Sequence, residues 1–584
     1  MTAPTARLTS TNRQAALEAM IDEPLDILVV GGGVTGAGIA LDAATRGLRV
    51  GIVEAQDWGA GTSSRSSKLV HGGLRYLQML DFKLVKEALG ERGLLIDRLA
   101  PHLVRAVPFL YPLNAWWERP YVAAGIGLYD ALATIGTRNR AVPTHRHLSA
   151  KGVQKVFPDI KPGACQGAVR YYDGQVDDAR LVVALIRTAA QYGALVASRT
   201  EVVELTKDAT GRVSGAVLND LESGSQLQVL ARTVISATGV WTEQTQNLAT
   251  DDGGLQVLAS KGIHIVVPKE RINSSNGFIL QTEKSVLFII PWSRYWVIGT
   301  TDTGYHGDLT HPVASAADID YVLDKANAII AEPLTRDDVI GTWAGLRPLL
   351  QPGTKGDDSK SSKVSREHTV TEVTPGLVSI AGGKLTTYRV MAEDAVDFAI
   401  GRARAKELPS ETATTPLVGA VGYHAYARQA DRIAATHGWD DFLVAHLLHR
   451  YGSSLPELLA LIDARPELAE RVPGAEAYLK AEIVYGVSHE GALHLEDVMT
   501  TRTRLTYEVR DHALAAVETI ADLMAGELGW SAERRNAEVE AYRARCAAED
   551  AAAAAPDDAG AQSARGRAGD PLSTLPGARV TSLA

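Results

Sequence analysis

The chain has 584 residues, more than one hydrophobic core accommodates, and this length predicts two or three domains. Its apolar fraction of 46% is ordinary for a globular protein, and its net charge of −10 argues against a nucleic-acid partner. The only two cysteines, Cys165 and Cys546, supply neither a Cys/His metal cluster nor a disulfide framework and suit a reducing compartment. We therefore expect no metal site.

Residues 1–23 form an N-terminal arm that lacks the apolar stretch of a secretory signal. No apolar run in the chain approaches the roughly 18 residues that a membrane-spanning helix needs. The segment 121–136 is apolar on most sides and follows Trp116, Trp117 and Arg119, a mixture of aromatic and basic residues that suits a bilayer interface. A buried helix is the alternative interpretation of this segment.

The first folded elements form a βαβ unit. Residues 25–30 (Leu-Asp-Ile-Leu-Val-Val) indicate a buried parallel strand, a helix follows over 37–46, and a second strand covers 49–54. A long loop rich in Gly, Ser and Arg extends from Gly59 to Gly73, and residues 81–99 are predicted to be helical.

Strands with alternating apolar and polar residues recur further along, typical of antiparallel sheet. They are predicted near 194–205, 213–218, 227–237, 263–267, 286–290, 295–300 and 377–381. This mixture predicts a nucleotide-binding α/β domain and a mainly antiparallel domain interleaved over residues 24–404. Helical periodicity then predicts a separate domain over 405–546, and the Ala-, Asp-, Gly- and Pro-rich residues 547–584 are predicted to be a disordered tail.

The turn after the first strand matches the dinucleotide-binding pattern G-x-G-x-x-G at Gly31, Gly33 and Gly36. Gly31 permits the tight turn, Gly33 leaves room for a pyrophosphate, and Gly36 lets helix and strand approach. The helix N-terminus offers N–H groups to the phosphates. Glu54, at the end of the next strand, is positioned to accept hydrogen bonds from ribose hydroxyls.

This loop alone suits either NAD or FAD. The segment behind it, Gly61-Thr-Ser-Ser-Arg-Ser-Ser-Lys68, is dense in small hydrogen-bonding groups that suit an extended FAD. A flexible, solvated loop is the alternative interpretation. An NAD-dependent dehydrogenase would carry no bound yellow cofactor.

The stretch Ser66-Ser-Lys-Leu-Val-His-Gly-Gly-Leu-Arg-Tyr-Leu77 resembles a motif of the FAD-dependent, respiratory glycerol-3-phosphate dehydrogenases, which belong to the D-amino-acid-oxidase-like flavoproteins. Further stretches resemble motifs of this family in the same order, at 234–241, 260–267, 343–349, 365–368 and 381–389. The resemblance implies an α/β fold: a Rossmann-like FAD-binding domain interleaved with a mainly antiparallel β substrate domain, followed by a C-terminal all-α domain.

The resemblance also implies bound FAD, and we expect it to be non-covalent although some relatives attach flavin through a histidine in the loop that holds His71. The glycine turn, the segment behind it and the resemblance together predict cofactor-binding residues at Gly31, Gly33, Val34, Thr35, Gly36, Glu54, Thr62, Ser63, Ser64, Ser66, Ser67, Lys68, His71, Gly72, Gly73, Ala237, Gly239, Gly382, Gly383, Lys384, Leu385 and Thr386.

The substrate that the resemblance implies is sn-glycerol 3-phosphate, oxidised to dihydroxyacetone phosphate by transfer of the C2 hydride to flavin N5. Arginine suits the phosphate because its planar fork makes paired hydrogen bonds to oxygens. The candidates that bind substrate are Arg75, Tyr76, Arg347 and Arg366, and their individual roles stay open.

Three residues are the candidate catalytic groups. Strand alternation places His264 on the face opposite Ile263 and Ile265, where either His264 or an arginine such as Arg347 would assist loss of the C2 hydroxyl proton. Lys384 would add positive charge near the reduced flavin. Asp302 would either orient site residues or end a strand, and the second interpretation is favoured here.

The sequence leaves the electron acceptor open. We expect a quinone, at a cytoplasmic protein bound peripherally to the inner face of the plasma membrane through the 121–136 segment. An oxidase that uses oxygen is the alternative enzyme, and a flavin-binding sensor without turnover is the alternative of another class. A homodimer is one hypothesis for the assembly.

Overall fold

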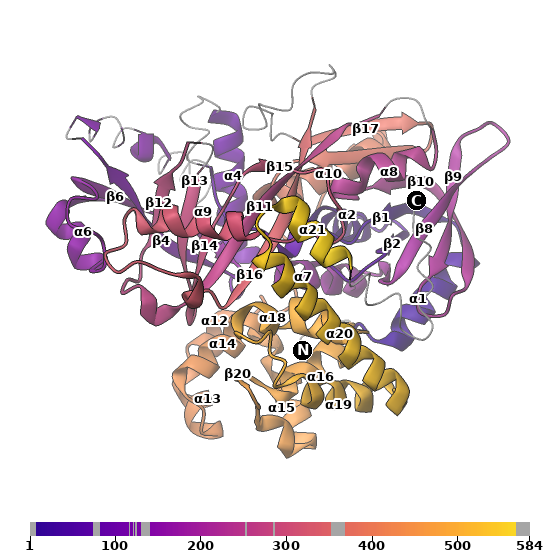
Figure 1. Cartoon of the computed structure of the whole chain (residues 1–584). Coiled ribbons are helices and arrows are strands. Elements are labelled where there is room, and N and C mark those ends of the chain that lie inside the picture. Colours follow the sequence, from indigo (N-terminus) through magenta and orange to yellow (C-terminus); the bar gives the residue numbers. More distant parts are fainter. Residues whose placement is uncertain are drawn as a thin grey trace.

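A computed structural model describes residues 7–73, 82–115, 117–118, 120, 122, 125–129, 141–250, 254–283, 286–351 and 368–567. Two sheets and a helical region make up this part of the chain (Figure 1). The predicted α/β class with a C-terminal helical domain is confirmed.

The first sheet has a parallel centre in the order β18-β10-β1-β2-β7, with antiparallel β17 attached to β18 and the antiparallel pair β8–β9 attached to β10. Its strands are β1 (Leu25–Val30), β2 (Val50–Val53), β7 (Leu195–Ala197), β8 (Thr200–Lys207), β9 (Val213–Asp220), β10 (Gln226–Ser236), β17 (His368–Thr374) and β18 (Leu377–Gly382). The strand predicted at 25–30 is confirmed to the residue.

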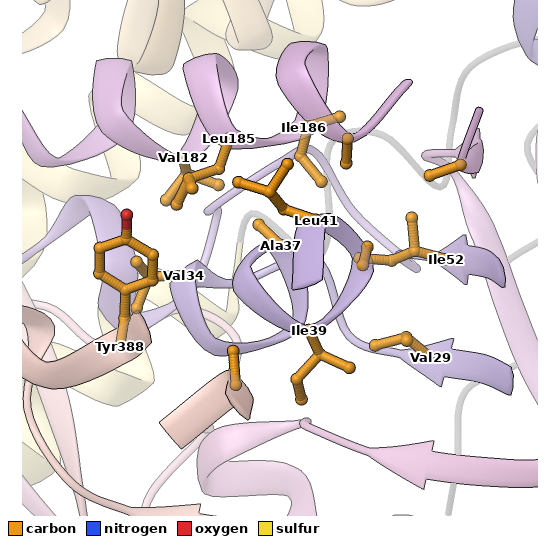
Figure 2. Close-up of a cluster of buried hydrophobic side chains, with 14 of the residues drawn as sticks. Val29, Val34, Ala37, Ile39, Leu41, Ile52, Val182, Leu185, Ile186 and Tyr388 are labelled. Carbon is orange, nitrogen blue, oxygen red and sulfur yellow. The ribbon is translucent and has the colours of Figure 1, made fainter. Parts of the chain in front are cut away.

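Three helices cover one face of this sheet: α2 (Val34–Thr45), α7 (Asp178–Gln191) and α10 (Tyr388–Ile400). Figure 2 shows α2 in the middle, with Val182 and Leu185 of α7 on one side and Tyr388 of α10 on another. The small residues of α2 permit this crowding, because a helix with little side-chain bulk approaches its neighbours closely.

The predicted N-terminal arm contains a docked helix, α1 (Ser10–Asp22). The Thr9 side chain accepts a hydrogen bond from the N–H of Asn12 and so caps the helix. Leu17 and Met20 are buried beneath it, and Arg13 forms a buried ion pair with Asp220 at the end of β9.

The second sheet is mainly antiparallel, as predicted, with one parallel pair between β12 and β4. Its strands are β3 (Leu69–Val70), β4 (Val104–Leu113), β5 (Arg146–Ser149), β6 (Gly167–Val176), β11 (Val257–Pro268), β12 (Gly277–Gln281), β13 (Val286–Trp292), β14 (Tyr295–Gly299), β15 (Thr303–Gly304) and β16 (Gly341–Leu350). Helix α9 (Ala316–Asn327), with a Ser315–Asp318 capping box, packs on it. The strands of these two sheets that were not predicted from the sequence are β3, β4, β5, β6, β12, β15, β16 and β17.

The remaining helices before residue 408 are short or connect the sheets: α4 (Phe82–Leu94), α6 (Ala150–Val156), α8 (Thr242–Asn247) and α11 (Arg402–Glu407). The segment predicted to be helical over 81–99 is α4 followed by one wider helical turn, Leu95–Leu99.

The C-terminal region is helical apart from one short hairpin, β19 (Arg471–Val472) with β20 (Ala475–Leu479). Its helices are α12 (Tyr423–Ala427), α13 (Ala430–His437), α14 (Asp441–Tyr451), α15 (Leu455–Ala464), α16 (Lys480–Ser488), α17 (Leu495–Asp497), α18 (Leu505–Glu508), α19 (Val517–Leu528), α20 (Ala532–Ala554) and α21 (Asp558–Gly566). No helix in the described ranges combines the length and the apolar character needed to cross a bilayer.

The prediction of a disordered tail from residue 547 is wrong for residues 547–567. Helix α20 continues to Ala554, and α21 follows after a short turn. Ala552 and Ala561 are buried against Val313, so the alanines that made this segment resemble a low-complexity tail form a contact surface. In Figure 1 these helices run from the helical domain up to the second sheet.

The segment from α20 to α21, residues 532–566, is called the C-terminal strap below. One of its polar contacts joins Asp558 to Lys261 on β11, whose ammonium also pairs with Asp318 at 2.6 Å. The Lys261 side chain is only 1% exposed, whereas that of Asp558 is 40% exposed. Because a buried ammonium needs compensating carboxylates, this contact ties the strap to β11.

We predict that Asp558→Asn loosens α21 without unfolding the sheets, because Asp318 continues to compensate Lys261. The loss of one partly exposed partner, about 1–2 kcal/mol, corresponds to roughly 5- to 30-fold faster amide hydrogen exchange across residues 558–566. Glu332→Gln, which breaks an exposed pair with Arg271, is the control and should leave this exchange unchanged. Equal protection of α21 in all three proteins would show that the ion pair does not hold the strap.

Candidate functional site

The glycine turn lies at the carboxyl ends of β1, β2 and β10, where ligands of open α/β sheets bind. Gly31 has a φ of +107°, and a Cβ there would lie 2.7 Å from the carbonyl oxygen of Ala237. A Cβ on Gly36 would overlap the carbonyl oxygen of Gly31. The turn therefore needs glycine at both predicted positions.

Helix α2 begins at Gly33, which provides no capping side chain. The N–H groups of its first turn are therefore available to bind an anion. The exception is the N–H of Val34, which donates to Ser63 Oγ at 2.9 Å. A Cβ on Gly33 would lie 3.1 Å from the same oxygen, so the space beside the helix terminus is kept clear. These features fit a dinucleotide pyrophosphate at Gly33, Val34, Thr35 and Gly36.

Glu54 follows β2 and holds the turn in place. Its carboxylate accepts hydrogen bonds from the N–H groups of Gly32 at 2.6 Å and Gln56 at 2.7 Å. Burial raises the pKa of Glu54, while these two donors and Arg199 act in the opposite direction. The carboxylate is therefore fixed at the strand end, and its contact with a ribose stays a prediction.

The loop from Gly59 to Gly73 is ordered, so the interpretation as a flexible, solvated segment is wrong. Asp178, at the start of α7, accepts hydrogen bonds from the N–H and Oγ of Ser66 at 3.0 and 2.7 Å and pairs with Lys68 Nζ at 2.9 Å. Thr62 Oγ1 donates to the carbonyl oxygen of Leu346 on β16 at 2.6 Å.

These contacts change the roles predicted for four loop residues. The side chains of Thr62, Ser66 and Lys68 hold the loop to the protein, and the carbonyl oxygen of Ser64 accepts from Lys68 Nζ at 3.1 Å. Burial and Arg504 lower the pKa of Lys68 to about 8, against the effect of Asp178. The Lys68 ammonium therefore belongs to this buried cluster, and contact of this segment with FAD stays a prediction.

A second pair of loops meets beside the first. Gly382 and Gly383 have φ values of +81° and +79° and precede a single helical turn over Leu385–Thr387. Helix α10 begins only at Tyr388 and therefore does not start directly after the two glycines. Thr386 Oγ1 accepts from the N–H of His71 at 3.0 Å, which joins this loop to the His71–Gly73 loop. Lys384 is partly buried in the same place.

The substrate side of the site is a face of the second sheet. β11 and β16 pair antiparallel with Ser260 opposite Arg347, Gly262 opposite Gly345 and His264 opposite Trp343. Residues that lie opposite each other on neighbouring strands share a face, so these six line one surface. Ile263 and Ile265 point to the other face, into the core, as predicted.

His264 is buried and neutral on this face. Its Nε2 lies 2.8 Å from Ser67 Oγ, and its ring stacks on Trp343 with centroids 5.1 Å apart. Burial, together with Arg347 and Lys68, holds the pKa of His264 well below the usual histidine value. His264 Nδ1 and Trp343 Nε1 are both buried without a hydrogen-bond partner among the described residues.

Arg347 is held by the end of β14 and the turn after it. Its Nη2 donates to Thr300 Oγ1 at 3.0 Å and to the carbonyl oxygen of Thr301 at 3.1 Å, and its Nη1 lies 3.5 Å from Asp302 Oδ1. A Cβ on Gly262 would overlap this guanidinium, so glycine makes the room that Arg347 occupies.

The interpretation of Asp302 as a strand end alone is wrong. β14 ends at Gly299, and Asp302 instead pairs with Arg347 and accepts a hydrogen bond from Ser260 Oγ. The candidates Arg75, Tyr76 and Arg366 lie outside the described residues.

Sequence reasoning missed Trp343, Asp178 and Tyr507, which support the site. Trp343 stands two residues before Gly345 in a motif that was noted only for its arginine. Tyr507, from the helical domain, packs edge-on against Trp343 at 5.6 Å. No local pattern marks Asp178 or Tyr507, because their partners are more than 100 residues away.

The segment 121–136, predicted to lie at a bilayer interface, contains both buried and exposed residues. Of its described residues, Ile126 and Tyr129 are buried, and Tyr129 OH accepts from the N–H of Gly72 at 2.9 Å. Leu128 is exposed, as is Trp117. Among the described residues of this segment, Tyr129 therefore supports the His71–Gly73 loop from within the protein.

Comparison with known proteins assigns both parts of the chain. Residues 26–389 match the family model of FAD-dependent oxidoreductases, and residues 410–535 match that of the C-terminal domain of alpha-glycerophosphate oxidase. A glycerol-3-phosphate dehydrogenase of Mycobacterium leprae is 48% identical over 97% of this chain and 95% of its own length. A human mitochondrial glycerol-3-phosphate dehydrogenase is 37% identical over 89% of this chain and 72% of its own length.

A solved structure agrees with these matches. The glycerol-3-phosphate dehydrogenase of Bacillus halodurans, in complex with FAD, superposes with a TM-score of 0.75 and 29% identity over 92% of this chain and 97% of that one. The prediction of FAD as cofactor is confirmed.

We predict that Gly36→Ala lowers FAD retention strongly, because the added methyl group would force the helix N-terminus away from the turn. The measurement is the ratio of flavin to protein absorbance after purification. Gly90→Ala is the control, because nothing lies within 4 Å of a Cβ at Gly90. A full flavin complement in Gly36→Ala would refute the role of this turn.

Proposed function

Because the chain belongs to the family of FAD-dependent glycerol-3-phosphate dehydrogenases, we propose that it oxidises sn-glycerol 3-phosphate to dihydroxyacetone phosphate and passes the electrons to a quinone. The bound FAD supplies the two-electron acceptor, at N5, for the hydride that leaves C2. The family membership rests on the relative that is 48% identical over 97% of the chain.

One observation carries the location of the chemistry. Two adjacent buried ring nitrogens, His264 Nδ1 and Trp343 Nε1, have no hydrogen-bond partner among the described residues and share a strand face with Arg347. Buried polar groups are nearly always satisfied, so such a pair favours a polar ligand at this face. The substrate hydroxyl groups are ligands of this kind.

We assign removal of the C2 hydroxyl proton to His264. The imidazole is neutral over the physiological range because burial, Arg347 and Lys68 disfavour its cation, and a neutral ring can accept a proton. Nδ1 is the accepting nitrogen in this proposal, so Nε2 carries the hydrogen and donates to Ser67 Oγ. Arg347 polarises the same hydroxyl group.

The phosphate group needs its own clamp. We propose Arg75, Tyr76 and Arg366 for this role, with Arg347 as a further contact, because arginine forks bind oxyanions with two hydrogen bonds. Lys384 and the N–H groups after Gly383 supply positive charge to the reduced flavin.

We further propose a cytoplasmic location with peripheral contact to the inner face of the plasma membrane. The exposed Trp117 and Leu128 support contact with an apolar surface. An oxidase that transfers electrons to oxygen is the second candidate, because residues 410–535 match the C-terminal domain of alpha-glycerophosphate oxidase.

We predict that glycerol 3-phosphate bleaches the flavin absorbance of the holoenzyme completely in the absence of oxygen. Adding a soluble quinone should then restore the oxidised spectrum faster than adding oxygen does, with little hydrogen peroxide per turnover. Rapid reoxidation by oxygen with one peroxide per turnover would identify the oxidase instead. If glycerol 3-phosphate does not change the flavin spectrum, the protein is either a flavin-binding sensor or an enzyme for another substrate.

We predict that His264→Gln lowers the rate of flavin bleaching by roughly 10²- to 10⁴-fold, the usual contribution of a general base. Glutamine preserves a hydrogen bond to Ser67, so flavin content should match the wild type. The measurement is anaerobic stopped-flow reduction with saturating glycerol 3-phosphate, and His437→Gln in the helical domain is the control. A wild-type rate in His264→Gln would remove histidine from the proton transfer.

Lys68→Met should move the acid limb of the kcat/KM profile to higher pH. Lys68 is one of the cations that disfavour the His264 imidazolium, so its removal raises the pKa of His264. Because the neutral imidazole is the active form, activity is lost at a higher pH, by on the order of one unit or less. The exposed Lys325→Met is the control. An acid limb that stays in place or moves to lower pH would contradict His264 as the base.

A further inference from the structure

A cleft separate from the flavin turn lies between the second sheet and the helical domain. Its walls are β4, the tip of the β13–β14 hairpin and helix α14, and it is open to solvent on one side. Ser293 and Arg294 form the hairpin tip, and the Arg294 guanidinium lies 4.6 Å from the ring of Phe442 on α14.

The inner wall of this cleft carries a cation without a carboxylate. Arg105 on β4 donates from Nε and Nη2 to Gln175 Oε1 at 3.0 and 2.9 Å, and from Nη1 to His449 Nδ1 at 2.8 Å. These bonds use three of its five N–H groups. The other two, one on each terminal nitrogen, have no partner within the described ranges.

His449 adds a third donor. Arginine cannot accept a hydrogen bond, so His449 Nδ1 accepts from Arg105 and the hydrogen of the neutral ring lies on Nε2. Burial and Arg105 lower the pKa of His449 to about 4, so the ring stays neutral at physiological pH. No described residue accepts from its Nε2.

The acidic residues of the cleft are already engaged. Asp177 pairs with Arg450 at 3.0 Å and with Arg504 at 2.7 Å. Glu508 accepts hydrogen bonds from Trp292 Nε1 at 3.1 Å and Tyr478 OH at 2.9 Å. The lining carries three guanidinium groups, Arg105, Arg294 and Arg450, against the two carboxylates of Asp177 and Glu508, so its charge balance is positive.

We propose that this cleft binds a small phosphate-bearing molecule, with its oxyanion on Arg105 and His449 and its organic part against Trp292 and Phe442. Two parallel N–H groups of an arginine match two oxygens of a phosphate, and partial burial strengthens such bonds. An apolar aromatic wall beside convergent donors is the usual composition of a ligand site.

The cleft adjoins the active site without sharing its ligands. Lys68 Nζ lies 5.9 Å from the centroid of the Trp292 ring and 4.6 Å from that of Trp343. Asp177 of the cleft is the direct neighbour of Asp178, which holds the Ser66–Lys68 segment. The proposal does not depend on the reaction assigned above, because none of its ligand-binding residues lies on the β11–β16 face.

The test is calorimetric titration of the holoenzyme with inorganic phosphate and with glycerol 2-phosphate, for the wild type, Arg105→Met and His449→Phe. The substrate site also accepts phosphate, so we expect the wild type to show two classes of binding site. Arg105→Met and His449→Phe should each keep the substrate site, while their affinity for phosphate at the cleft falls at least tenfold. Arg271→Met, which changes a half-buried arginine outside the cleft, is the control and should keep both classes of site.

Two further measurements keep the test decisive. KM for glycerol 3-phosphate and the flavin content should be unchanged in the variants, which distinguishes loss of phosphate binding in the cleft from misfolding. Arg105→Lys replaces Arg105→Met if the latter fails to fold. Co-sedimentation with phosphatidylglycerol vesicles, lost in Arg105→Met, would assign the phosphate to a lipid headgroup rather than a soluble molecule. Identical two-class binding in wild type and Arg105→Met, or a single class in the wild type, would overturn the proposal.

Discussion

The antiparallel pairing of β11 with β16 is the constraint on which the candidate active site depends. Its register sets His264 beside Trp343 and Ser260 beside Arg347, with Gly262 and Gly345 between them. A slip of one residue would turn His264 into the apolar core and bring Ile263 to the substrate face. The space that Gly262 leaves for the Arg347 guanidinium exists only in this register. The chemistry proposed for the site thus depends on the register of this strand pair, because the register brings the reacting side chains together.

A second constraint joins the three parts of the protein. Asp178, at the start of α7, holds the Ser66–Lys68 segment from one side, and Arg504 of the helical domain pairs with the same carboxylate. Arg502, two residues earlier, pairs with Asp57 beside the glycine turn. Because buried charges require partners, these ion pairs fix the helical domain against both the cofactor loop and the glycine turn. The helical domain is therefore part of the framework of the site.

The sequence predicted those features that depend on neighbouring residues. The strand at 25–30, the glycine turn and the placement of His264 on the face opposite Ile263 and Ile265 follow from apolar runs, glycine spacing and alternation. The buried pair between Lys68 and Asp178 was not predicted, because the two residues are 110 positions apart in the sequence and no local pattern links them. The tail prediction failed for another reason: alanine is the strongest helix former, so residues 547–554 continue α20 by local propensity, and Val313 and Lys261 then provide a surface for the strap. Long-range partners of this kind leave no mark in local sequence patterns.

The account places oxidation of glycerol 3-phosphate on the β11–β16 face, and a crystal structure of the holoenzyme with dihydroxyacetone phosphate bound tests this claim most directly. We predict product density between the flavin and this face, with its C2 oxygen within hydrogen-bond distance of His264 and Arg347. Its phosphate group should contact at least one of Arg75, Tyr76 and Arg366. Product bound in another place, with Arg347 still turned only to Thr300 and Asp302, would contradict the account.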